Sequence, residues 1–156
     1  MKTVKWKKIS RFKGPEQSPG FLLWQVSTEW RRQIEAGLAT VGLTHPQFVL
    51  LANVGWLTSK GQQVTQVELA RHCKTDINMT SQILRTLERK GYIQRLPCKE
   101  DERSKLPHIT KSGVQLIEKS IPLVESIDEK FFGTLKQTNI KKWVDICHAL
   151  LDSSCK

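Results

Sequence analysis

The stretch CKEDERSKLPHIT, residues 98–110, places a thiol, an imidazole and a cluster of charged side chains between two apolar runs. Cysteine and histidine are zinc ligands, and an exposed thiol is also a candidate for oxidation. Lysine and arginine are the side chains with which proteins hold phosphates. Three interpretations therefore stand at this point: a solvated loop, a metal or redox site built on Cys98 and His108, or a surface that grips another molecule.

The other cysteines and histidines do not complete a metal site. The chain has four cysteines and four histidines. It has no Cys-x-x-Cys pair, and no histidine stands at ligand spacing from a cysteine. The neighbours His72 and Cys73, like Cys147 and His148, point to different faces of a helix. Cys73 and Cys147 fall on apolar stripes and are predicted to behave as small hydrophobic residues. We expect no metal and no cofactor, and Cys98 is the candidate thiol for a redox-sensing alternative.

Catalysis is not indicated by the residue types or their spacing. The sequence shows no pairing of a nucleophile with a base and no loop that would cradle a phosphate. We therefore expect a protein that is not an enzyme and that acts by binding.

Length and composition indicate one soluble domain. The chain has 156 residues, of which 38% are hydrophobic and 26% are charged. No run approaches the roughly 18 apolar residues of a membrane span, and the basic N-terminus lacks the apolar segment of a secretory signal. We expect a cytoplasmic protein with reduced cysteines and no membrane partner.

The net charge of +10 is concentrated in two regions. Residues 1–13 carry six Lys or Arg and no acids, and residues 71–111 carry ten Lys or Arg against five acids. The segments 14–70 and 112–156 are close to neutral. A focused positive field of this kind favours a polyanionic partner, with DNA or RNA ahead of an anionic membrane surface.

Two short helices joined by a tight turn are predicted between residues 65 and 91. TQVE, residues 65–68, is a capping box that starts the first helix. Asp76 can cap the second helix, which is expected to end at Gly91. The pair is a candidate helix-turn-helix.

A β-hairpin is predicted directly after the second helix. YIQRL (92–96) and KLPHI (105–109) are strand-like, so that residues 98–104 become the hairpin loop. Pro107 lies in the returning strand and is expected to leave it short or bulged, because proline lacks the N–H of a ladder bond. Helix, turn, helix and hairpin follow one another in the order of a winged helix.

Long helices are predicted on both sides of this motif. Apolar residues at helical spacing indicate a first helix over 21–41, and THPQ (44–47) is a capping box for a second helix over 45–58. Two further helices follow Thr110, the first of them kinked at Pro122. Their apolar surface exceeds what a small winged helix can cover, so a homodimer is expected; packing on their own domain is the alternative.

These motifs, taken in order, resemble the MarR family of bacterial transcriptional regulators from about Gly20 to Leu151. The segments that carry the resemblance are ELA (68–70), TSQILRTLERKGYI (80–93), DER (101–103) and ITKSG (109–113), with GFLLWQVSTEWRR and GLTHPQFVLL as the first two helices. The resemblance implies a mainly α (α+β) fold: a winged helix-turn-helix with a two-stranded wing and terminal helices that form a dimerisation region.

The resemblance also implies a domain plan. Residues 19–152 are expected to form a single domain. Within that domain, the DNA-binding winged helix covers about 45–110, and the dimerisation helices cover about 19–41 and 112–152. Residues 1–18 are expected to form a flexible basic arm because they mix Lys, Gly, Pro and Ser with few apolar positions, and this arm is longer than the family requires. Members of the family are typically homodimers that bind palindromic operators in double-stranded DNA, usually repress, and often respond to small aromatic ligands or to oxidants.

The second helix of the motif is expected to enter the major groove. Its polar face offers amide and guanidinium groups that pair with adenine, guanine or phosphate. The residues assigned to it are Asn78, Met79, Ser81, Gln82 and Arg85. An ordinary solvated helix face is the alternative. Thr65 and Gln66, at the start of the preceding helix, are expected to contact a phosphate.

On the wing, Arg103 is the residue expected to enter the minor groove, where the negative potential is enhanced. Asp101 is predicted to hold its side chain extended. Lys99 and Lys105 are predicted phosphate contacts. A solvated loop with a local ion pair is the alternative.

The resemblance to the MarR family implies an effector pocket between the terminal helices and the winged helix. Its candidate residues are Trp24, Trp30, Arg31, His45 and Trp56, where Arg31 or His45 would meet an anionic group. A core or interface role is the alternative for each tryptophan. A second hypothesis for the whole protein is an architectural or RNA-binding winged helix without sequence specificity, and a third is a redox-sensing regulator that acts through Cys98.

Overall fold

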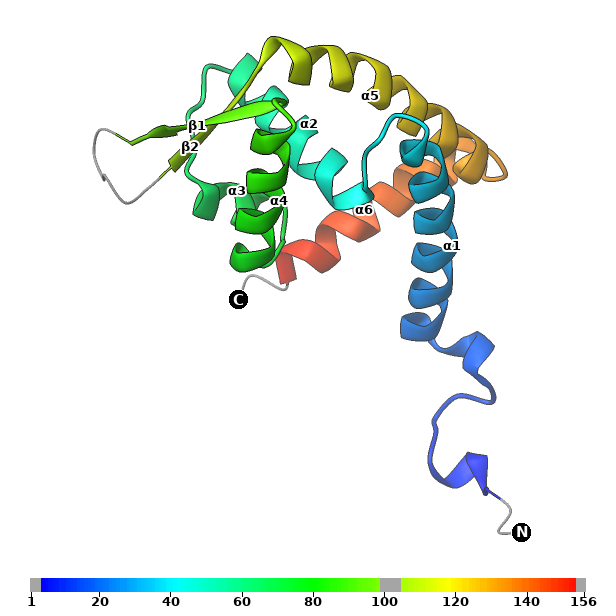
Figure 1. Ribbon diagram of the computed structural model, residues 1–156. Coiled ribbons are helices and arrows are strands. Elements are labelled where there is room, and N and C mark those ends of the chain that lie inside the picture. The colour runs from blue at the N-terminus through cyan, green and yellow to red at the C-terminus, as the bar shows by residue number, and fades with distance from the viewer. Residues whose placement is uncertain (1–3, 99–104, 154–156) are drawn as a thin grey trace.

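The structure, a computed structural model, describes residues 4–98 and 105–153. Six α-helices and one pair of antiparallel strands occur within these ranges, after a short N-terminal arm (Figure 1). The elements are α1 (Pro19–Ala39), α2 (His45–Ser59), α3 (Gln66–His72), α4 (Ile77–Arg89), β1 (Ile93–Pro97), β2 (Lys105–Ile109), α5 (Lys111–Phe132) and α6 (Gln137–Ser153). The predicted fold class, mainly helical with a two-stranded wing, is confirmed.

Side-chain caps set the helix starts. In α2, the Gln47 N–H donates to the Thr44 hydroxyl at 3.4 Å, and the Thr44 N–H donates to Gln47 Oε1 at 3.3 Å. The same reciprocal bonds join Thr65 and Glu68 at the start of α3, at 3.3 and 2.7 Å. The Asp76 carboxylate accepts a backbone N–H of α4 at 2.9 Å. Both predicted capping boxes and the Asp76 cap are confirmed.

The wing strands pair in a register that is unbroken over five residue pairs. Pro107 lies opposite Arg95 within that register. The expectation that Pro107 leaves the strand short or bulged is therefore wrong. In a two-stranded sheet, every second N–H of each strand points away from the partner strand, so a proline at such a position removes no ladder bond.

The core lies around α2, which packs against α1, α4, α5 and β2. Leu50, Leu51 and Val54 of α2 are at most 2% exposed. Leu84 and Leu87 of α4 are fully buried against the same core. Burying one such side chain stabilises the fold by roughly 1.5–3 kcal/mol. The core therefore holds α4 on the body by one face and leaves its other face free.

α5 continues as one helix through Pro122 and lies against α1. Asp128, which interrupts the apolar stripe of α5, accepts a hydrogen bond from Trp30 Nε1 of α1 at 2.7 Å. This bond gives the polar residue a partner on the neighbouring helix. Among the described residues, none of the helices combines the length and the apolar character needed to cross a bilayer.

The two ends of the described chain lie apart from the core. α6 has no buried residue among those described. Residues 4–18 form an arm with two short 3-10 turns, Trp6–Lys8 and Pro15–Gln17, which extends away from the body before the first residue of α1 (Figure 1). The predicted domain boundaries and the flexibility of the arm stay predictions.

Candidate nucleic-acid interface

α4 has one buried and one exposed face. Thr80, Leu84 and Leu87 are fully buried, so the opposite side of the helix faces solvent. The residues predicted to contact DNA lie on that side: Asn78, Met79, Gln82 and Arg85 are exposed, and Ser81 is half-buried. The fold therefore brings the five predicted residues of this helix onto one accessible surface.

Hydrogen bonds as well as packing fix α4 relative to α3. The buried Thr80 hydroxyl donates to the Asp76 backbone carbonyl at 2.8 Å and lies 2.8 Å from the Thr75 hydroxyl. Thr75 Oγ1 also contacts the Ala70 carbonyl of α3 at 3.4 Å. Because Thr80 is buried, breaking this network would leave its hydroxyl without a partner. The exposed face of α4 is thus presented at a fixed angle.

The exposed face of α4 carries no free negative charge. The segment 77–87 contains no acidic residue. The one carboxylate of the helix, on Glu88, accepts bonds from Nη2 and Nε of Arg95 of β1 at 2.6 and 2.8 Å. Hydrogen bonding to the Arg95 guanidinium holds the pKa of Glu88 below its usual value. The carboxylate is therefore ionised at neutral pH and matched by its own arginine.

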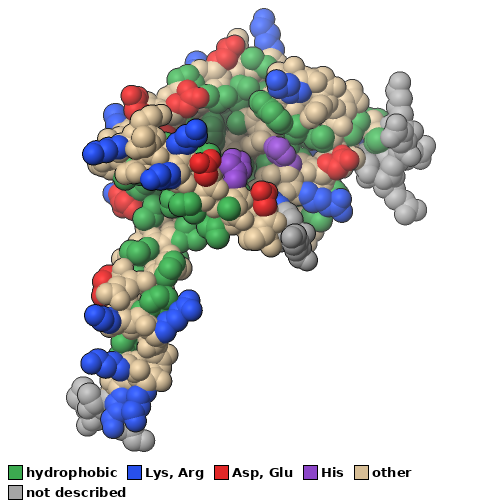
Figure 2. All heavy atoms as spheres, turned by 180° about the vertical axis from the view of Figure 1, so that it is seen from behind, with side chains coloured by type: hydrophobic (Ala, Val, Ile, Leu, Met, Phe, Trp, Pro, Cys, Tyr) green, Lys and Arg blue, Asp and Glu red, His purple; other side chains and the backbone are tan. Residues whose placement is uncertain are grey.

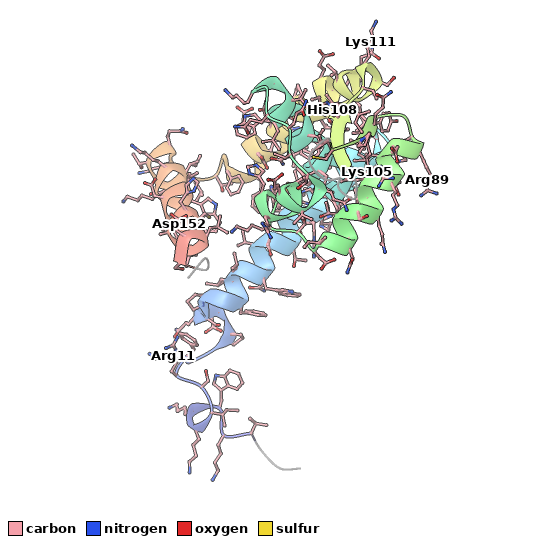
Figure 3. All side chains as sticks on the ribbon, turned by 90° about the vertical axis from the view of Figure 1, so that its left-hand side faces the viewer. Arg11, Arg89, Lys105, His108, Lys111 and Asp152 are labelled. Atoms are coloured by element: carbon pink, nitrogen blue, oxygen red, sulfur yellow. The ribbon has the colours of Figure 1, made fainter. Side chains whose placement is uncertain are left out.

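A groove of about 630 Å³ runs between α4 and β1. Its lining is rich in guanidinium groups: Gln82, Arg85, Thr86, Glu88, Arg89 and Arg95. Figure 3 shows Arg89 and Lys105 near α4, on the side of the body away from Asp152 of α6. Guanidinium groups match the geometry of phosphate oxygens, so the groove suits an anionic backbone.

Sequence reasoning missed the position of Arg95. The sequence places Arg95 in a strand, as the structure does, but it does not predict that the Arg95 guanidinium ties the wing to Glu88 in the last turn of α4. Glu88 and Arg95 stand on either side of the Gly91 turn. The opposite charges of Glu88 and Arg95 on either side of this turn could have suggested the ion pair. The distance between the two side chains, however, depends on how the hairpin folds back onto α4.

The start of α3 carries the predicted capping box, which bears on the expected phosphate contact. The Thr65 hydroxyl caps the helix, and the Glu68 carboxylate accepts the Thr65 N–H and hydroxyl at 2.7 and 2.9 Å. These bonds lower the pKa of Glu68, which places a negative charge where a phosphate was expected. Gln66 Oε1 is buried and has no hydrogen-bond partner among the described residues. A phosphate contact by Thr65 and Gln66 stays a prediction.

The tip of the wing lies outside the described residues, which include neither Lys99, Asp101 nor Arg103. Their predicted contacts with DNA stay predictions. Lys105 is described: it is exposed at the start of β2, opposite Pro97. The described base of the wing therefore adds one cation beside the arginine-lined groove.

The five candidate pocket residues do not meet around one cavity. Trp30 lines a cavity between α1 and α5, but the other four do not line it. The His45 ring packs edge-on against Trp30 with centroids 5.1 Å apart, and Trp56 stacks on His72. The remaining two candidates, Trp24 and Arg31, are exposed on α1. Their roles in ligand binding stay predictions.

The described cysteines and histidines form no metal cluster. Within residues 4–98 and 105–153, no group of three or more His, Cys, Asp or Glu is arranged to hold a metal ion. Cys73 packs against the core, as expected, and its burial raises the pKa of the thiol. Cys98 is half-buried at the end of β1, and Cys147 is half-buried on α6. Redox sensing by Cys98 stays a hypothesis.

Comparison with known proteins shows which family the chain resembles. The family model described as "MarR family" matches residues 43–105. The HTH-type transcriptional regulator YdcH of Bacillus subtilis (strain 168) is 43% identical over 131 residues, which cover 83% of this chain and 89% of YdcH. The HTH-type transcriptional repressor Rv2887 of Mycobacterium tuberculosis (strain ATCC 25618 / H37Rv) is 29% identical over 116 residues, 74% of this chain and 81% of that protein.

Solved structures share the same fold. A mutant of MarR from E. coli, complexed with operator DNA, superimposes with a TM-score of 0.75 at 23% identity. The match covers 85% of this chain and 92% of that chain. In the described structure, α3, α4 and the β1–β2 wing provide the helix-turn-helix and wing that the family model spans. The chain therefore belongs to the MarR family of winged-helix transcriptional regulators.

Proposed function

We propose that the protein is a homodimeric repressor that binds a palindromic operator in double-stranded DNA. The observation that carries the proposal is the exposed face of α4, which offers Asn78, Gln82 and Arg85 without a free acid. Amides pair with adenine and guanidinium groups with guanine in the major groove. Repression is supported by the relative named as a repressor, and DNA binding by the fold shared with a MarR–operator complex.

The dimer is supported by apolar side chains that the single chain leaves exposed. On α1 these are Phe21, Leu22, Leu23, Trp24 and Val26, and on α6 they are Val144, Ile146, Leu150 and Leu151, each between 37 and 61% exposed. Figure 2 shows hydrophobic side chains along the stalk that α1 and the N-terminal arm form, with lysine and arginine side chains toward the tip, where the arm lies. Apolar surface of this extent on two helices is typical of a subunit interface.

A palindromic operator follows from the symmetry of such a dimer. A two-fold axis places two copies of α4 in successive major grooves, with half-sites about 34 Å apart. A small aromatic effector would act by favouring a dimer geometry in which the two α4 helices no longer match that spacing.

The test is an anisotropy titration of the full-length protein with two DNA duplexes at two salt concentrations. One duplex comes from the region upstream of the protein's own gene, and the other is a random sequence of the same length. We expect tighter binding to the first duplex at both salt concentrations, because base contacts add to the salt-dependent phosphate contacts. Equal affinities would contradict the repressor and favour a winged helix that binds nucleic acid without sequence specificity.

A further inference from the structure

The N-terminal arm carries a group of positive charges that the proposed DNA contact of α4 and the wing does not use. Residues 4–13 hold five Lys or Arg and no acid, and the side chains of all five are exposed. The other basic region of the chain, residues 71–111, is the one that contains α4 and the wing strands. The five cations of the arm are Lys5, Lys7, Lys8, Arg11 and Lys13.

No acid of the described chain neutralises these charges. The ion pairs within residues 4–98 and 105–153 join Arg32 to Glu29 and Arg95 to Glu88. In the same ranges, none of the five arm cations has a carboxylate partner. Like charges that lie close together without counter-ions repel one another, so an anion that contacts several of them at once relieves the repulsion.

Local hydrogen bonds give the arm a defined shape. The Lys8 N–H donates to the Lys5 carbonyl at 2.9 Å, within the turn Trp6–Lys8. The Trp6 indole N–H donates to the Phe12 carbonyl at 3.1 Å and closes the segment between these two residues into a loop. Because the cations stand on an ordered backbone, less conformational entropy is lost when they bind an anion together.

The aromatic ring of Phe12 is used within the arm. The guanidinium carbon of Arg11 lies 4.9 Å from the centroid of the Phe12 ring, and Phe12 is half-buried. A ring that a guanidinium covers is not free to stack on an unpaired base, and it cannot enter a bilayer without taking the charge with it. The arm therefore suits the backbone of a duplex better than a single strand or a membrane.

The arm and the α4 groove lie at different ends of the molecule. The arm precedes α1, which has 21 residues and therefore spans about 30 Å. It extends away from the body on the far side from the wing (Figure 1). Figure 3 shows Arg11 near the lower end of the molecule, and Arg89 and Lys105 at the upper right. The cations of the arm are therefore a surface separate from the arginine-lined groove.

We infer that residues 4–13 form a second DNA-binding surface, which holds backbone phosphates of double-stranded DNA outside the segment that α4 and the wing contact. A duplex carries one negative charge per about 1.7 Å of its axis, so it offers phosphates to several cations at once. Lysines bind phosphate as point charges and do not read bases there, so the surface adds affinity without sequence preference. The inference rests on the proposed function for the DNA held by α4, whereas the hold of the arm on a duplex requires no operator.

The test is the salt dependence of binding to a random-sequence duplex, measured by fluorescence anisotropy on the full-length protein. Each phosphate contact contributes about 0.9 to the slope of log affinity against log salt concentration. The arm variant, in which Lys5, Lys7 and Lys8 are replaced by Gln, should lower this slope by about 2.7 for each arm that contacts the duplex. Between about 50 and 200 mM salt, it should lose roughly 40-fold less affinity than the unchanged protein.

Matched variants separate a contact from the general field of the protein. Replacing the same three lysines of the arm by Arg keeps the charge and should leave the slope unchanged. The control variant removes three charges from exposed positions of α5, α6 and the segment between them, and its slope should be nearly that of the unchanged protein. Its substitutions are Lys130→Gln, Lys136→Gln and Lys141→Gln. Circular dichroism verifies that each variant is folded.

The position of the contact is tested with operator duplexes of two lengths and with capture of a second duplex. If the arm holds flanking DNA, random flanks should raise the affinity of the unchanged protein but not that of the arm variant. If the arm holds a second duplex, bead-bound complexes of operator and protein should capture a labelled random duplex, and complexes of the arm variant should not. A loss of slope without either effect would overturn the separate position of the surface.

Equal slopes for the arm variant and the unchanged protein would overturn the inference, and so would an equal loss of slope in the control variant. Vesicles of phosphatidylcholine and phosphatidylglycerol are the competing target, because Val4, Trp6 and Ile9 of the arm are exposed. If the three lysines matter for sedimentation with these vesicles but not for the duplex, the partner is a membrane surface and the inference fails. If the protein does not distinguish its own upstream DNA from random DNA, the proposed function fails while the result for the arm stands.

Discussion

At the scale of single residues, Arg85 is the described side chain on which the proposed DNA contact is tested most directly. It is exposed on α4, one turn after Gln82, and both line the groove that Arg95 and Arg89 also border. Glu88 does not compete for it, because that carboxylate is bonded to Arg95. Arg85 forms no ion pair within the described chain. Its guanidinium can therefore donate two hydrogen bonds to a guanine or to a phosphate.

Replacing Arg85 by alanine should therefore weaken binding to the operator by about 1–3 kcal/mol, roughly 5- to 150-fold. If Arg85 reads a base, the loss should be larger on the operator than on random DNA; if it holds a phosphate, the loss should be equal on both. Anisotropy titrations with both duplexes decide between these roles. Arg32→Ala, on α1, is the control and should leave both affinities unchanged. An Arg85→Ala protein with unaltered binding would remove this residue from the interface.

His45 gives the fold a dependence on pH. Its folded-state pKa is lowered from 6.5, mainly by burial, so between that lowered value and 6.5 the unfolded chain binds more protons than the folded chain. The free energy of unfolding therefore falls as the pH falls through this window, and the contribution of His45 is complete above about pH 6.5. Urea denaturation between pH 5.5 and 7.5 should show the slope. The His45→Gln variant should show a smaller slope, and an identical slope would contradict the assignment.

At the scale of elements, the junction between the wing and α5 is closely packed. Thr110 N donates to the Tyr92 carbonyl at 3.0 Å, and its hydroxyl donates to the Gly91 carbonyl. Gly113 is buried in the first turn of α5, and a Cβ there would collide with the Tyr92 carbonyl and lie 2.8 Å from Ile109 Cγ1. The small residue at position 113 thus lets α5 approach the backbone that precedes β1.

Gly113→Ala should destabilise the protein by about 1–3 kcal/mol, since the added methyl group overpacks a buried contact with backbone. Gly20→Ala is the matched control. Gly20 lies in the first turn of α1 with nothing within 4 Å of an added Cβ, so the change should be neutral or stabilising by up to about 1 kcal/mol. Thermal and urea denaturation measure both. Equal stability of the two variants would show that the junction is not closely packed.

At the scale of the whole molecule, the exposed apolar side chains of the terminal helices are the basis of the proposed dimer. α6 adds no buried side chain to the described core, and about half of the surface of Leu151 and Ile146 is exposed. An exposed apolar helix face is unfavourable in water. In the proposed homodimer, a second copy of the chain covers these apolar side chains.

Leu150→Glu should therefore shift the protein from dimer to monomer at micromolar concentration, because a carboxylate would be buried in the interface without a partner. Operator affinity should fall in parallel, since two half-sites are then no longer bound together. Analytical ultracentrifugation measures the first effect. Lys141→Glu, also exposed on α6, changes the charge without removing apolar surface and should leave the dimer intact. A dimeric Leu150→Glu protein would place the interface elsewhere.

The sequence by itself determined the order of the elements and the starts of α2, α3 and α4. Capping residues such as Thr44, Thr65 and Asp76 act within one turn of the chain, and so does the apolar spacing that buries Leu84 and Leu87. Local interactions of this kind can be predicted from residues that are close together in the sequence. For the same reason the exposed face of α4, and with it the predicted contacts Gln82 and Arg85, followed from the pattern alone.

Only the tertiary structure decided which distant residues meet. Asp128 is 98 positions from Trp30 along the chain, and their hydrogen bond depends on how α1 and α5 cross. The pairing of Arg95 with Glu88, and the unbroken register at Pro107, depend on how the hairpin returns to α4. These contacts arise from packing between elements, whose geometry is set by the whole core, so neither spacing nor composition could predict them.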